Sequence, residues 1–121
     1  MKVKEHLRSA DEFYEIGMKE YEEGKRGGDL TRMREGCEKV FHAYVEASTA
    51  LIQKSGLPEP ESHADRYESL YKLNEKRMID VGKDAFFFLH KFAYYDGRIF
   101  PDVEKTLKDV DETIRYVREK L

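Results

Sequence analysis

The chain has 121 residues with no shift in composition along its length, so we expect a single domain over residues 1–121. Hydrophobic residues make up 40% of it and charged residues 39%, which is enough apolar surface for a packed core and too much for a disordered chain. The formal net charge of -3 gives no overall positive field, so neither DNA nor a membrane surface is expected as a partner. The lone Cys37 and a start without an apolar signal-peptide segment predict a cytoplasmic protein.

Glycine and proline residues divide the chain into about five predicted helices. The first runs over Ser9–Glu23, with Ser9 as N-cap, and ends at Gly24. The second runs over Asp29–Ser55, capped by Asp29 and followed by the stop signals Gly56 and Pro58. These two long helices therefore supply the first half of the fold.

The second helix has the strongest core pattern. At 100° per residue, one narrow arc holds its apolar side chains: Met33, Cys37, Val40, Tyr44, Ala47 and Leu51. Glu38, His42 and Glu46 form a row nearly opposite this arc. We interpret the row as a solvated face with i,i+4 pairs, because the ligands of a metal bound inside a helical bundle point inward. The helix is expected at the centre of the fold, and no metal site is expected.

The second half of the chain should hold three more helices. Ser62 and Asp65 form a capping-box pattern that opens a helix through about Met78. Its expected inward-facing residues are Tyr67, Leu70 and Tyr71. The fourth predicted helix, residues 84–95, is apolar nearly all round and too short for a membrane, so other helices or a second subunit must cover it. The last helix follows Pro101 and carries a seam at spacings of four and three: Val103, Leu107, Val110, Ile114, Val117 and Leu121.

No alternating strand pattern competes with these helices. We therefore predict an all-α fold, an up-and-down bundle of four to five helices. Its predicted buried residues include Phe13, Cys37, Val40, Tyr44, Leu51, Leu70, Phe88, Leu89, Val110 and Ile114.

The candidate binding residues cluster after the fourth helix. His90 lies among aromatic residues, and Tyr94, Tyr95 and Arg98 follow it closely. Aromatic side chains combined with arginine are typical of sites for single-stranded RNA or nucleotides. The alternative is that His90 is a hydrogen-bonded interior histidine and that the tyrosines only pack.

A second candidate is the start of the third helix, where His63 and Arg66 lie beside free backbone N–H groups that could bind a phosphate. A simple capped helix start is favoured, since Asp65 and Glu68 oppose an anion there. His6 is expected in a frayed N-terminus. The common nucleotide-loop, zinc and serine-hydrolase motifs do not occur in the sequence, so no catalytic residue, metal or cofactor is expected.

The order of these segments resembles the HEPN superfamily over about Ser9 to Leu73. The residues that carry the resemblance are Ala10 and Tyr14 in the first helix, then three stretches: Arg34-Glu-Gly-Cys-Glu-Lys-Val-Phe-His-Ala-Tyr-Val-Glu-Ala-Ser-Thr-Ala-Leu-Ile52, Gly56-Leu-Pro58 and Glu61-Ser-His-Ala-Asp-Arg66. The resemblance implies a helical bundle that commonly dimerises. Members of this superfamily act as RNases or as partners of small nucleotidyltransferases in toxin–antitoxin systems.

Active HEPN nucleases carry an Arg followed after four to six residues by a His. Here seven residues separate Arg34 from His42, and His90 precedes Arg98. The resemblance therefore implies a homodimeric, non-catalytic module that binds a nucleotide, RNA or a nucleotidyltransferase-type partner. Two alternatives remain open: a scaffold protein that assembles through the fourth helix or the Val103–Leu121 seam, and a cryptic RNase.

Overall fold

The protein is an all-α helical bundle, as predicted. The computed structural model describes residues 2–121, and this part of the chain contains no β-strand. Its elements are α1 (Val3–Gly27), α2 (Leu30–Lys54), α3 (His63–Lys72), α4 (Lys76–Asp84), the π-helix η1 (Ala85–Tyr95) and α5 (Asp102–Lys120).

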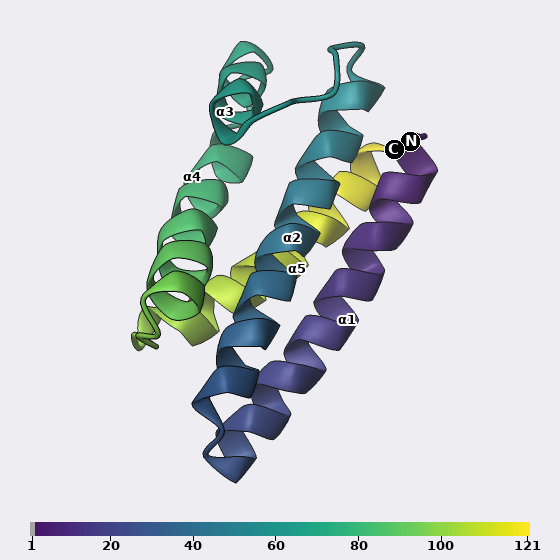
Figure 1. Cartoon of the computed structure of the whole chain (residues 1–121). Helices are drawn as coiled ribbons and strands as arrows, with labels where there is room; N and C mark the ends of the chain where they lie inside the picture. The colour runs from purple at the N-terminus through teal and green to yellow at the C-terminus, as the bar shows by residue number, and fades with distance from the viewer. Residues whose placement is uncertain (1) are drawn as a thin grey trace.

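The central helix is α2, in agreement with the sequence pattern. Together with α1 it forms a long antiparallel hairpin, while α4 and η1 run down its other side and α5 crosses behind it (Figure 1). The turn of this hairpin contains Gly28, which has a positive φ of 67°. The next residue, Asp29, caps α2, because its side chain accepts a hydrogen bond of 3.1 Å from the Arg32 backbone N–H. The predicted start of the second helix is thus confirmed.

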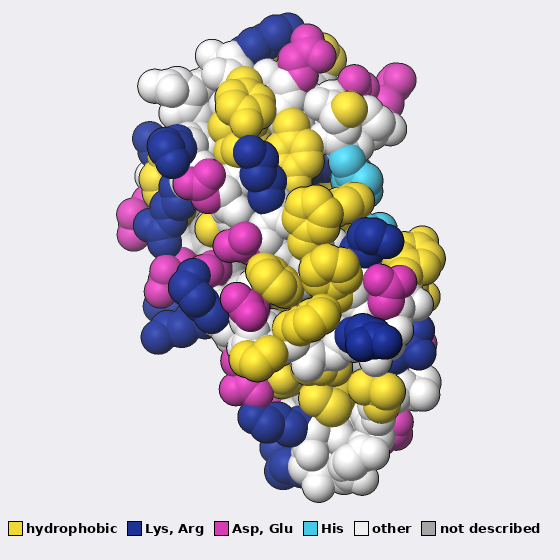
Figure 2. All heavy atoms as spheres, turned by 90° about the vertical axis from the view of Figure 1, so that its left-hand side faces the viewer, with side chains coloured by type: hydrophobic (Ala, Val, Ile, Leu, Met, Phe, Trp, Pro, Cys, Tyr) yellow, Lys and Arg dark blue, Asp and Glu magenta, His cyan; other side chains and the backbone are white. Residues whose placement is uncertain are grey.

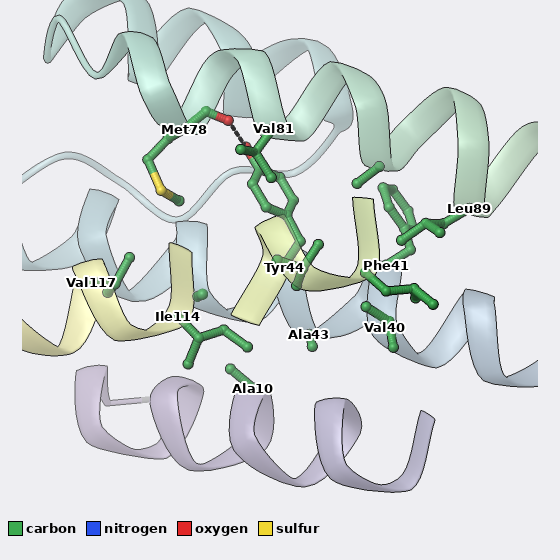
Figure 3. Close-up of a cluster of buried hydrophobic side chains, with 14 of the residues drawn as sticks. Ala10, Val40, Phe41, Ala43, Tyr44, Met78, Val81, Leu89, Ile114 and Val117 are labelled. Carbon is green, nitrogen blue, oxygen red and sulfur yellow. Dashed lines mark hydrogen bonds between the residues drawn. The ribbon is translucent and has the colours of Figure 1, made fainter. Parts of the chain in front are cut away.

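Most of the predicted core is confirmed. Eight of the predicted residues are buried: Cys37, Val40, Tyr44, Leu51, Leu70, Leu89, Val110 and Ile114. Side chains of α2 reach toward α4 and η1, and the Tyr44 hydroxyl donates a hydrogen bond of 2.6 Å to the Met78 carbonyl (Figure 3). For Phe13 and Phe88 the prediction was wrong, because both lie at the edge of the core and are only half-buried.

The start of α1 differs from the prediction. The helix begins at Val3 rather than at Ser9, and His6 is buried rather than frayed. The His6 Nδ1 atom lies 2.6 Å from Glu46 Oε2 on α2, and its Nε2 atom lies 3.1 Å from Glu59 Oε1 in the following loop. These tertiary contacts outweigh the local capping preference of Ser9.

The third and fourth predicted helices are divided differently in the structure. α3 ends at Lys72, and Asn74 takes a left-handed conformation with φ 55°, which asparagine tolerates better than most residues. α4 then begins at Lys76 and continues into η1 without a break at Asp84. Tyr71 was expected to face inward, but it lies in the last turn of α3 and is 59% exposed.

η1 packs against α2 and α5 and keeps part of its surface exposed. Its buried residues are Ala85, Leu89 and Ala93, at the spacing of four that suits the wide turn of a π-helix. Most of its large rings lie away from this buried row. The α5 seam, in contrast, is buried within the bundle from Val103 to Val117. None of the helices described over residues 2–121 is both long and apolar enough to cross a membrane.

Candidate functional site

His90 lies in η1 and is held by a carboxylate from α2. Its Nδ1 atom lies 2.8 Å from Oε1 and 3.1 Å from Oε2 of Glu38. An ionised carboxylate only accepts hydrogen bonds, so Nδ1 carries the proton and donates it. In the neutral imidazole this leaves Nε2 as a hydrogen-bond acceptor. The His90 ring also stacks on Phe41, with 4.6 Å between centroids and an interplanar angle of 26°.

His63 of α3 lies beside His90, although the two are far apart in the sequence. Their ring centroids are 5.9 Å apart, and Phe86 contacts both rings at 5.4 Å. Partial burial lowers the pKa of His63, and Coulombic interaction with Arg66 and with the neighbouring histidines His90 and His42 also lowers it. His63 therefore favours its neutral form, which can accept or donate one hydrogen bond.

Two tyrosines and an arginine enclose a hollow next to His90. Tyr95 is 65% exposed, and its ring meets the rings of His90 and Tyr94 edge-on at 4.9 Å and 5.3 Å. The Arg34 guanidinium of α2 donates hydrogen bonds to the Tyr94 carbonyl at 3.0 Å and 2.5 Å, which fixes the end of η1. The hollow has a volume of about 360 Å³ and is lined by Thr31, Arg34, Glu35, Tyr94 and Tyr95. We call Arg34, His90, Tyr94 and Tyr95 the tyrosine site.

The two remaining candidate residues lie in different surroundings. Arg98 is exposed and follows Gly97, a turn residue with φ 69°, directly after η1. Arg66 is buried, and its Nε–H donates a hydrogen bond of 2.9 Å to Ser48 Oγ. The start of α3 is capped as predicted, since Ser62 Oγ accepts from the Asp65 backbone N–H at 3.0 Å. The structure therefore brings His63, His90, Tyr94 and Tyr95 together and places Arg66 beneath the surface.

The expectation of a solvated row with i,i+4 pairs on α2 holds for the pair of His42 Nε2 and Glu38 Oε2, 3.7 Å apart, but solvent exposure was wrong for two of the three members. Glu38 binds His90 and Glu46 binds His6, so both carboxylates are largely buried, while His42 remains exposed. The row faces away from the arc of Cys37 and Tyr44, but α1 and η1 flank α2 closely enough to cover it. Periodicity on one helix cannot show where neighbouring helices lie.

Sequence reasoning missed Glu38 and Arg34 as parts of the site. Nothing local marks them, because their partners are 52 and 60 residues away in the chain. The resulting site offers an exposed aromatic ring and an imidazole, and an exposed arginine, Arg98, follows three residues after Tyr95 in the chain. These groups suit a ligand that combines an aromatic base with a phosphate.

No arrangement of three or more His, Cys, Asp or Glu side chains that could hold a metal ion occurs in the described part of the chain. Comparison of the sequence and fold with protein-family models, curated proteins and solved structures found no match.

Proposed function

We propose that this protein is a HEPN-like helical module that binds a nucleotide or single-stranded RNA at the tyrosine site without cleaving it. The observation that carries the proposal is the position of Tyr95, which is 65% exposed beside the hollow and packs edge-on against His90. An exposed ring held by a second ring can stack on a base at little cost in conformational entropy.

An exposed arginine that follows η1 is the candidate for a phosphate contact. Arg98 lies just beyond the turn at Gly97, where its guanidinium can pair with a phosphate oxygen. The chain carries a net charge of -3, so stacking rather than long-range attraction should supply most of the affinity. A short ligand therefore suits the site better than a long duplex. A nucleotidyltransferase-type partner, the other ligand that the resemblance implies, would contact the same surface.

Binding can be measured with a fluorescent single-stranded RNA oligonucleotide and with AMP at low salt. Tyr95→Ala should cost about 1–3 kcal/mol of binding free energy, roughly a 5- to 150-fold rise in Kd, because one stacking platform is lost. Arg98→Ala should weaken binding. It should also reduce the magnitude of the slope of log K against log salt by about one, because the variant makes one phosphate contact fewer and binding then releases fewer counterions.

Tyr71→Ala is the matched control, because Tyr71 is equally exposed at 59% but lies at the end of α3, outside the tyrosine site. Its affinity should equal that of the unaltered protein. Absence of binding at low salt, or equal losses in the two tyrosine variants, would contradict the proposal and favour a scaffold role.

A nuclease is the second candidate, and the Glu38–His90–His63 cluster is the observation that favours it. A histidine oriented by a carboxylate beside a second histidine can serve in general acid–base catalysis. Our proposal predicts that RNA stays intact during incubation with pure protein. Cleavage that disappears on His90→Ala would show that the protein is a nuclease.

A further inference from the structure

Four phenylalanine rings form a connected surface on the outer side of η1. Phe92 contacts Phe87, Phe88 and Phe100 with centroid distances of 6.1 Å, 6.0 Å and 5.2 Å, and Phe88 also contacts Phe100 at 6.4 Å. We call these four residues the aromatic band. Phe87 is 47% exposed and Phe100 is 39% exposed.

The aromatic band is only partly covered by its own chain, since Phe88 and Phe92 are half-buried and Phe87 and Phe100 are exposed. The fully buried positions of η1 are Ala85, Leu89 and Ala93, so two of the three hold alanine and the large rings of the helix keep part of their surface exposed. Figure 2 shows hydrophobic side chains gathered along this face of the molecule. Connected aromatic surface in contact with water is costly and marks a place where another molecule binds.

The charges around the aromatic band favour a second copy of the chain. Lys91 of η1 and Asp96, the residue after this helix, lie 4.0 Å apart, and Lys105 and Asp109 pair on α5 at 2.8 Å. Figure 2 shows side chains of both signs beside the hydrophobic surface. An anionic membrane or nucleic acid requires a positive border, which this mixed pattern does not supply. A two-fold axis brings the same patch of both subunits together and lets cations of one copy meet anions of the other.

The size of the aromatic band fits the centre of a dimer interface. With about 200 Å² of surface per ring, the four partly exposed side chains offer on the order of 300 Å². The polar rim would supply the rest of the roughly 800 Å² that each partner buries in a standard interface. The alternative surface that the sequence suggested, the α5 seam, is already buried inside the bundle.

We propose that the aromatic band is the two-fold interface of a homodimer. The proposed dimer does not require a ligand at the tyrosine site, because none of the four residues of that site belongs to the band. A failure of one proposal therefore leaves the other standing.

Sedimentation velocity over about 1–100 µM protein tests the dimer, a range in which an interface of standard size should be occupied. The unaltered protein should have twice the 14.3 kDa chain mass. Phe87→Glu should raise the dissociation constant at least tenfold, because it buries an unpaired carboxylate in the interface. Ile16→Glu is the matched control: Ile16 is 50% exposed on α1, away from η1, and its variant should remain a dimer.

Circular dichroism should show unchanged helix content in each variant, and Phe100→Glu provides a second test if Phe87→Glu fails to fold. A monomeric unaltered protein at the highest concentration would overturn the proposal. A dimer that survives both phenylalanine substitutions would also overturn it, since the interface would then lie elsewhere. Flotation of the protein with anionic vesicles that depends on Phe87 would identify a membrane as the occupant and equally overturn it.

Discussion

At the scale of single residues, the core of this protein contains weak acids in their neutral form. Burial, together with the smaller effect of the nearby Glu38 carboxylate, raises the pKa of Cys37 from 9.0 to about 12. Burial also raises the pKa of Tyr44, whose hydroxyl is fixed on the Met78 carbonyl. Cys37 is consequently a buried apolar side chain rather than a reactive thiol.

These raised pKa values predict a loss of stability at alkaline pH. In the unfolded chain Cys37 ionises near its ordinary pKa of 9.0 and Tyr44 near 10.0, while in the folded state both keep their protons. The unfolded state then binds fewer protons, so stability is fully present below about pH 9 and falls as the pH rises toward 12.

Urea unfolding between pH 8 and pH 11 measures this effect. The free energy of unfolding should fall with a slope of up to about 1.4 kcal/mol per pH unit for each buried group. Cys37→Ala should make the slope shallower from pH 9 upward. A stability that stays constant to pH 11 would show that these side chains are accessible to water.

At the scale of helices, close packing of α1 on α2 depends on glycine. A Cβ atom on Gly36 would lie 2.5 Å from the Gly17 carbonyl oxygen and 2.6 Å from the Tyr21 backbone nitrogen. Both neighbours are backbone atoms, so the helices would have to move apart.

Gly36→Ala should therefore lower the free energy of unfolding by about 1–3 kcal/mol, the usual cost of overpacking. Gly27→Ala is the control, because a Cβ atom there meets nothing within 4 Å at the end of α1. It should be neutral or stabilise the protein by up to about 1 kcal/mol through helix propensity. Equal effects in thermal unfolding would contradict close contact between the two helices.

The sequence predicted those helices whose signals are local. The caps Asp29 and Ser62 and the periodic arc of α2 were enough to place these features correctly. The break at Asn74 was missed because its left-handed conformation depends on a single residue within a helix-compatible stretch. The π-helical winding of η1 was also missed, since a segment apolar on all sides shows no periodicity from which to measure the turn.

The candidate site was predictable only in part. His90, Tyr94 and Tyr95 are close in sequence and were expected to act together, as the structure places them. Glu38 and His63 join them through tertiary packing, which one sequence does not reveal.

At the scale of the whole molecule, the tyrosine site and the aromatic band meet on η1. Phe86 contacts His90 at 5.4 Å and Phe87 at 5.5 Å, so one ring joins the two surfaces. The opposite side of the bundle has its own hollow of about 350 Å³ between α1 and α5, lined by residues that include Tyr14, Met18 and Lys25. We propose that ligands bind on the η1 side rather than in this second hollow.

Nuclear magnetic resonance titration of the labelled protein with AMP and with a short single-stranded RNA tests this claim most directly. Changes in the backbone amide signals should concentrate at Arg34, at His90 and over residues 94–98. Shifts confined to the hollow between α1 and α5, or no shifts at millimolar AMP, would contradict a nucleotide site on η1.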